Sequence, residues 1–217
     1  MGNTVLVTGV SRHLGARVAR SLAAHPDVGH VIGLDVIPPV EQLGRADFVR
    51  ADVRNPVVGR LLEQEKVRTV IHLALSTFAA HGRERASQKE ANVIGTMQLL
   101  AACQSSRHLR RVVLKSTCEV YGSSPRDPAM FAEDAVRPGA RVHGAIRDAQ
   151  EVEGYLRATS RRRPDLETTT LRMAHVIGPR VESELLDYLA LPVVPVPFGY
   201  DARLQFLHED DAVAAIV

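Results

Sequence analysis

The first fifteen residues of the chain contain a strand, a glycine turn and the start of a helix in immediate succession. The apolar run from Asn3 to Val7 predicts a buried strand, Thr8 and Gly9 interrupt it, and Gly15 opens a helical stretch that extends to Ala24. In such a turn the first glycine permits a tight bend and the last permits close packing of helix on strand. The free N–H groups at the start of the helix favour a pyrophosphate. These residues predict a dinucleotide-binding turn.

One glycine of the usual fingerprint is missing from this turn. Between Gly9 and Gly15, where the pattern has a further glycine, the chain carries Arg12 and His13. A side chain at that place crowds the pyrophosphate, so the departure favours a weakened affinity for the cofactor.

Beyond the turn, strands alternate with amphipathic helices. This alternation predicts an α/β fold, a doubly wound parallel sheet of the Rossmann type with helices on both faces and a ligand outside the carboxyl ends of the strands. We expect strands over residues 30–36, 48–51, 69–74, 111–114 and 168–171, and helices over 57–66, 87–105 and 139–160.

The whole chain, residues 1–217, is interpreted as one NAD(P)-binding domain. Near its end, Asp210 and Asp211 are expected to cap a helix that reaches Val217 without a stop signal. This pattern predicts a chain trimmed at its C-terminus, with the substrate-binding part largely absent.

Composition narrows the classes of partner. A net charge of +2 gives no electrostatic case for nucleic acid, and no apolar run reaches the length of a membrane span. The two cysteines do not make a disulfide framework, and the first residues lead directly into a strand rather than a signal peptide. We therefore expect a cytoplasmic protein that binds a small molecule, without nucleic-acid or membrane partners.

Asp35 ends the second predicted strand, twenty residues after Gly15. An acidic residue at this point can accept hydrogen bonds from the adenosine ribose, and its charge repels a 2′-phosphate. The expected cofactor is therefore NAD, with NADP disfavoured. A surface aspartate in a loop is the plainer alternative.

Several segments in register resemble the extended short-chain dehydrogenase/reductases, and among them the NAD-dependent epimerases and dehydratases of nucleotide sugars. The segments are TGxxxxxG at 8–15, Asp35, Asp52-Val53, HLA at 72–74, NVIGTMQLL at 92–100, STCEVYG at 116–122, LRMAHVIGP at 171–179 and LQFLHEDDAVAAI at 204–216.

The resemblance implies a role for particular residues around the cofactor and the substrate. Thr117 takes the place of the active-site serine or threonine, Tyr121 reaches the substrate, and His175 stands where an asparagine touches a substrate phosphate. A homodimer through the two long helices, 87–105 and 139–160, is also implied. The implied cofactor residues are Gly9, Arg12, Leu14 and Gly15 at the pyrophosphate, Asp35 at the ribose, Asp52 and Val53 at the adenine, and Leu73, Ala74 and Asn92 toward the nicotinamide.

Arg12 also resembles an arginine of the single-domain branch of the family, where it meets a 2′-phosphate and would favour NADP. Asp35 argues the other way. We give Asp35 more weight because an acid at the ribose excludes the phosphate directly.

The family's reaction uses a tyrosine followed four residues later by a lysine, and this chain has no such pair. At the matching place it reads HGAIR, from His143 to Arg147. The candidate catalytic residues are therefore Thr117, His143 and Arg147. A histidine, with an ordinary pKa of about 6.5, could carry the proton. Arg147 could hydrogen-bond the nicotinamide ribose but cannot exchange protons.

Three functions stay open at this point. The first is an NAD-dependent epimerase or dehydratase of nucleotide sugars that works with His143. The second is a dinucleotide-binding sensor or scaffold in which His143 and Arg147 are solvated helix residues and the chemistry is lost. The third, supported only by the missing glycine, is a structural subunit that has abandoned the cofactor.

Overall fold

Six parallel strands form a single sheet in the order β3-β2-β1-β4-β5-β6. The computed structural model describes residues 2–76, 85–122, 128, 130–135, 144–181, 183–196, 198–199 and 204–217. The order reverses between β1 and β4, as in the predicted doubly wound sheet. The strands are β1 (Asn3–Thr8), β2 (Val28–Asp35), β3 (Asp47–Arg50), β4 (Thr69–His72), β5 (Arg111–Thr117) and β6 (Glu167–Met173).

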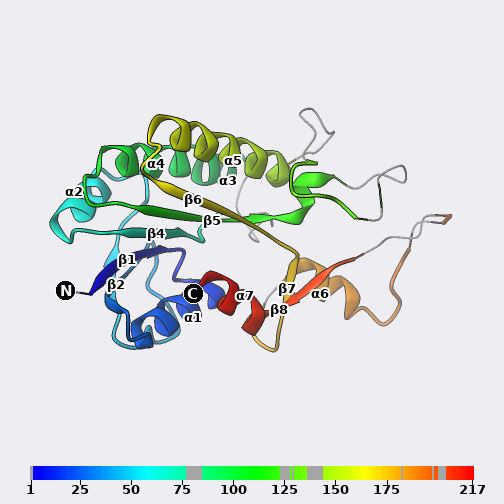
Figure 1. Cartoon of the computed structure of the whole chain (residues 1–217). Helices are drawn as coiled ribbons and strands as arrows, with labels where there is room; N and C mark the ends of the chain where they lie inside the picture. Colours follow the sequence, from blue (N-terminus) through cyan, green and yellow to red (C-terminus); the bar gives the residue numbers. More distant parts are fainter. Residues whose placement is uncertain are drawn as a thin grey trace.

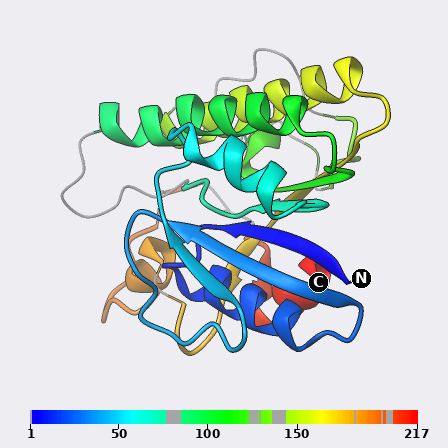
Figure 2. The same cartoon turned by 90° about the vertical axis from the view of Figure 1, so that its left-hand side faces the viewer.

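Helices cover both faces of the sheet, as Figures 1 and 2 show. One face carries α1 (His13–Ala24) and α7 (Glu209–Ile216). The other carries α2 (Val57–Gln64), α3 (Arg85–Lys89), α4 (Gly95–Ser105) and α5 (Gly144–Arg162). A π-helical turn, η1 (Glu90–Ile94), joins α3 to α4. The helix expected from residue 139 is described from Gly144 onward, and residues 139–143 lie outside the described part.

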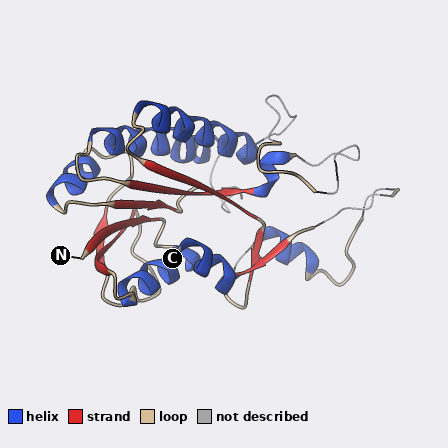
Figure 3. Cartoon of the chain, in the orientation of Figure 1, coloured by secondary structure: helices blue, strands red, loops and turns tan. Residues whose placement is uncertain are grey.

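A second, two-stranded parallel sheet lies beyond the carboxyl end of β6 (Figure 3). It consists of β7 (His175–Ile177) and β8 (Phe206–His208), with α6 (Glu184–Leu189) between them in the chain. Strands of three residues carry too little alternation to be recognised from the sequence, and this sheet was not predicted.

The expected cap of the last helix is corrected by the structure. His208, rather than Asp210 or Asp211, is the N-cap of α7, and its Nδ1 accepts a hydrogen bond from the Asp210 N–H at 3.3 Å. The two aspartates and Glu209 lie in the first turn, where negative charge favours the helix dipole. None of the described helices is long and apolar enough to cross a membrane.

Alternate residues of β5 enter two separate cores. Val112 and Leu114 pack in the core beneath α4 and α5, whereas Val113 packs in the core beneath α1 and α7. Because side chains alternate along a strand, Lys115 and Thr117 lie on the α1 face. This parity decides which side chains of β5 can reach the glycine turn.

Candidate functional site

The glycine turn is closely packed where the strand order reverses. Gly9 has a φ of +84°, and a Cβ there would lie 2.8 Å from the backbone nitrogen of Ala74, after β4. A Cβ on Gly15 would lie 2.1 Å from the Gly9 carbonyl oxygen. Only glycine fits these two positions, so the close approach predicted for the turn is confirmed in its geometry.

The start of α1 has the features of an anion-binding helix end. Arg12 is the N-cap residue and makes no side-chain cap hydrogen bond, and the first turn holds no acidic residue. Its N–H groups have no partner within the helix, as at any helix start. Leu14 packs against the core beneath α1. A phosphate placed here would meet N–H donors and a favourable dipole.

The side chain of His13 has partners of its own. Its Nδ1 contacts the carboxylate of Glu41, after β2, and its Nε2 contacts the carboxylate of Glu209 at the start of α7. The His13 hydrogen bond lowers the pKa of Glu41 below its ordinary value, with Arg20 adding to the effect. His13 is therefore held on the α7 side of the turn, and the weakened cofactor affinity stays a prediction.

Asp35 lies beside the glycine turn at the end of β2. One carboxylate oxygen accepts hydrogen bonds from the Ser11 N–H (3.0 Å) and the Ser11 hydroxyl (2.7 Å), and the other accepts one from the Val36 N–H (2.7 Å). A carboxylate oxygen can accept more than one hydrogen bond, so acceptor capacity remains for ribose hydroxyls. The residue that was expected to bind the ribose also fixes the turn.

Asp52 and Val53 lie after β3, on the adenine side of the expected site. The Asp52 carboxylate accepts a hydrogen bond from Arg54 Nη2 at 2.7 Å, and Arg54 holds the pKa of Asp52 below its ordinary value. Val53 packs against the core under α4, and a Cβ on Gly95 would lie 2.9 Å from its Cγ2. Asp52 is thus an ionised acceptor with a partner.

Asn92 supports the segment that follows β4. Its Oδ1 accepts from the Ser76 N–H (3.0 Å), and its Nδ2 donates to the Ser76 carbonyl oxygen (2.7 Å). Leu73 is buried and its N–H donates to the Thr8 carbonyl oxygen at 3.2 Å. The side chain of Asn92 therefore braces the segment that follows β4, and its role toward the nicotinamide stays a prediction.

A polar cluster follows the carboxyl end of β5. The Thr117 hydroxyl donates to Glu119 Oε2 at 3.2 Å and accepts from the Glu119 N–H at 3.3 Å, at the start of the short 3-10 helix η2 (Cys118–Tyr121). Glu119 Oε1 lies 3.9 Å from His175 Nε2. The structure thus joins Thr117 to His175 through Glu119, which sequence reasoning missed. The available sequence signal was the position of Glu119, a carboxylate only two residues after Thr117.

Tyr121 lies beside a cavity of about 570 Å³. Its hydroxyl oxygen accepts from Arg172 Nη1 at 2.9 Å, and its ring stacks on Phe131 with centroids 5.2 Å apart. The cavity runs along the free edge of β6 to Phe206. Tyr121 is therefore positioned at an open hollow, and its contact with a substrate stays a prediction.

Of the two residues that replace the family's tyrosine and lysine, the structure describes Arg147, which has no contact with Thr117 among the described residues. His143 lies outside the described residues. The side chain of Arg147 is 71% exposed, and its Nε lies 3.6 Å from Glu151 Oε1, one helical turn later. This placement agrees with a solvated helix residue, and the catalytic role of both residues stays a prediction.

A second missed residue is Lys115, two residues before Thr117 on the same face of β5. Burial, with the charge of Arg12 adding to it, lowers the pKa of the Lys115 amine to about 8. Its position inside a strand hid it, because a lysine there is ordinarily interpreted as a solvated residue.

Comparison with known proteins gives a family match and longer relatives. The sequence model of the NAD dependent epimerase/dehydratase family matches residues 5–217. An uncharacterized protein of Mycobacterium tuberculosis is 49% identical over 216 residues, covering 98% of this chain and 57% of its own length. The UDP-glucose 4-epimerase of Mycolicibacterium smegmatis is 29% identical over 185 residues, 81% of this chain and 56% of the relative. The chain therefore spans less than two thirds of these relatives.

Solved structures share the fold. The UDP-glucose 4-epimerase of Thermotoga maritima, solved with UDP-glucose, has a TM-score of 0.78 and 24% identity, and the match covers 98% of this chain and 72% of that one. The dTDP-glucose 4,6-dehydratase of Streptomyces venezuelae, solved with NAD bound, has a TM-score of 0.77 and 26% identity, with coverage of 98% and 70%.

Proposed function

The chain belongs to the NAD-dependent epimerase/dehydratase family, and from this we propose that it binds NAD and acts on a nucleotide sugar by transient oxidation of the sugar. The strongest support is the glycine turn at the reversal of strand order, with Asp35 bonded to it through Ser11. The nucleotide-sugar part rests on similar proteins named for UDP-glucose and dTDP-glucose.

The residues around the turn fit a dinucleotide. We assign the pyrophosphate to the start of α1 with Gly9, Arg12, Leu14 and Gly15, and the adenosine ribose to Asp35. The remaining assignments are Asp52 and Val53 at the adenine, and Leu73, Ala74, Asn92 and Arg147 toward the nicotinamide. NAD supplies the oxidant when it is bound.

Thr117 is proposed to bind the reacting sugar oxygen. Its hydroxyl donates to the Glu119 carboxylate and accepts from the Glu119 N–H, so one lone pair is left to accept a hydrogen bond from a sugar hydroxyl. Tyr121 and His175 are proposed to bind other parts of the substrate, and His143 to carry the proton. A cytoplasmic location and a homodimer through α3–α4 and α5 belong to the same proposal.

The proposal is tested by calorimetry with NAD and NADP, followed by turnover assays on a panel of UDP- and dTDP-sugars. We expect NAD to bind more tightly than NADP. Asp35→Asn should lower the affinity for NAD by roughly tenfold and reduce the difference in affinity between NAD and NADP. Asp27→Asn, at an exposed position after α1, is the matched control. Failure of the wild-type protein to bind NAD at millimolar concentration would refute the proposal.

A second candidate is a dinucleotide-binding protein without the family's chemistry. The exposed side chain of Arg147, paired with Glu151, favours it. Binding of NAD, no turnover across the panel and no effect of His143→Ala on any measured property would support this candidate over the enzyme.

A further inference from the structure

Lys115 is a partly buried lysine on the face of β5 that α1 covers. It lies on β5 between Val113, which is in the core under α1, and Thr117 at the strand end. Among the described residues, its amine has no hydrogen-bond partner and no carboxylate within ion-pair distance. A partly buried amine without a partner is incompletely solvated, and an anion that pairs with it would stabilise its charge.

Two charged groups act on this amine, and they come from different elements. Arg12 faces it from the glycine turn and Glu119 from η2. Glu119 is itself shared with Thr117 and with His175 of β7. Arg12 and Lys115 therefore repel each other across the carboxyl ends of β1 and β5, with the end of β4 between them.

We propose that Lys115 and Arg12 together bind the diphosphate of the dinucleotide, with Lys115 supplying from β5 a cation that the glycine turn alone does not offer. The proposal rests on the proposed function, because it concerns the same cofactor. An anion between the two cations removes their repulsion and adds to the N–H donors of α1. The same pair of charges offsets the loss of the middle glycine.

Binding of the diphosphate is then linked to a proton. In the free protein the pKa of Lys115 is lowered to about 8 by burial and by Arg12. A phosphate beside the amine favours the charged form, so the pKa rises on binding and a proton is taken up above that pH. Affinity is therefore greatest below the pKa of the free form and falls as the pH rises through it.

The experiment measures the affinity of NAD, ADP-ribose and UDP by calorimetry from about pH 7 to about pH 9.5. For the wild-type protein we expect the affinity for NAD and ADP-ribose to fall by up to about tenfold per pH unit above about pH 8. In Lys115→Met we expect the affinity for NAD and ADP-ribose to be roughly 10- to 100-fold weaker at pH 7, as for loss of one charge-assisted hydrogen bond. The fall in affinity above about pH 8 should be absent from this variant.

Two further variants separate charge from titration. Lys115→Arg keeps the charge but does not titrate in this range, so it should bind at pH 7 nearly as the wild type does and lose the fall above pH 8. Lys66→Met removes a lysine at the amino end of β4 and should match the wild type throughout. The pKa of Cys118 is raised by burial and by Glu119, and its thiol is present in every variant. If the fall in affinity above pH 8 is lost in Lys115→Arg, the Cys118 thiol is excluded as its cause.

Each outcome decides the assignment. Unchanged ADP-ribose affinity in Lys115→Met at pH 7, or a wild-type pH profile in Lys115→Arg, overturns the role of Lys115 and leaves NAD binding intact. An effect on UDP but not on ADP-ribose assigns the cation to the sugar nucleotide and overturns the proposal as stated. A wild-type protein that binds neither NAD nor ADP-ribose refutes the proposed function itself. Thermal unfolding of Lys115→Met checks that the variant is folded.

Discussion

His72 lies at the centre of a buried chain of hydrogen bonds beneath the glycine turn. The Thr8 hydroxyl lies 2.6 Å from Nδ1, and Nε2 lies 2.9 Å from the hydroxyl oxygen of Thr96, which donates to the Asn92 carbonyl oxygen. Because the Thr96 proton goes to Asn92, Nε2 must carry the ring proton and Nδ1 must accept from Thr8. The residue is a neutral core histidine.

Neutral burial of this ring predicts loss of stability in acid. Burial lowers the pKa of His72 to about 4, below its ordinary value of 6.5. The unfolded chain therefore takes up a proton that the folded chain does not, between those two values. The contribution of neutral His72 to the free energy of unfolding is fully present above pH 6.5. It is lost as the pH falls toward 4, and the total loss is about 3 kcal/mol. Urea unfolding across this range measures it.

The matched comparison is His72→Asn against His25→Asn. His25 is exposed after α1, so its replacement should keep the acid slope of the wild-type protein. The slope should be smaller in His72→Asn, measured relative to that variant's own stability at pH 7. An equal slope in both variants would assign the acid lability to the carboxylates instead.

At the scale of elements, one buried carboxylate joins α5 to the sheet. Glu153 is 1% exposed and accepts hydrogen bonds from Ser116 of β5 (2.7 Å) and from Arg172 of β6 (2.8 Å). Arg172 also donates to the hydroxyl oxygen of Tyr121. The orientation of Tyr121 at the cavity therefore depends, through Arg172, on the carboxylate of Glu153 in α5.

Removal of this carboxylate should be far more costly than removal of an exposed one. Glu153→Ala leaves the half-buried guanidinium of Arg172 without its main partner, and we expect a loss of about 3–5 kcal/mol in the free energy of unfolding. Glu167→Ala breaks the exposed pair with Arg111 (2.7 Å) and should cost less than about 1 kcal/mol. Equal losses in urea unfolding would contradict the importance given to burial.

Most elements of the main sheet could be predicted from the sequence because they carry their own signals. The apolar run before Gly9 and the stripe of α1 decide local structure without reference to distant residues. Tertiary contacts decide the rest. Whether Lys115 faces solvent or the glycine turn depends on α1 and α7, which cover its face. The pairing of β7 with β8 joins segments separated by α6.

At the scale of the whole molecule, the last helix is tied to the first. His13 and Arg17 of α1 contact Glu209 of α7, and Arg17 also contacts Asp210. The His13 contact spans 196 residues of chain. The sequence predicted the dinucleotide turn from its spacing, yet it could not show that a residue in place of a glycine would bind the far end of the fold. Such a partner is set by the packing of α7 on α1.

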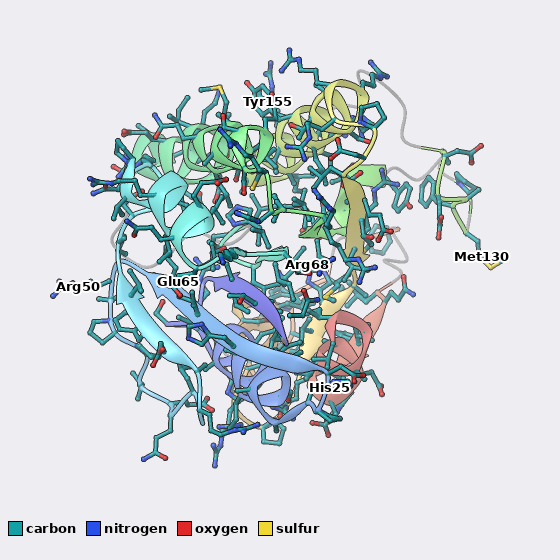
Figure 4. The ribbon with its side chains drawn as sticks, turned by 60° about the vertical axis from the view of Figure 1, so that its left-hand side comes forward. His25, Arg50, Glu65, Arg68, Met130 and Tyr155 are labelled. Atoms are coloured by element: carbon teal, nitrogen blue, oxygen red, sulfur yellow. The ribbon has the colours of Figure 1, made fainter. Side chains whose placement is uncertain are left out.

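The proposed homodimer would form through the outer side of the helical layer made by α3, α4 and α5. Ile94, Met97 and Tyr155 are large apolar residues on these helices and are each more than a third exposed. Tyr155 lies on the side of the layer away from the sheet (Figure 4). Apolar side chains on adjacent helices are what a four-helix interface would bury.

Sedimentation should accordingly show a dimer that Met97→Glu or Tyr155→Glu converts to a monomer, because a buried unpaired charge opposes association. Val196→Glu, at an exposed apolar residue between α6 and β8, places the same charge elsewhere and should leave the dimer intact. The glycine turn leads into α1, which covers the other face of the sheet, so NAD affinity should survive in the monomeric variants. A wild-type protein that sediments as a monomer, or a dimer that persists in both helix variants, would show that this layer is not the interface.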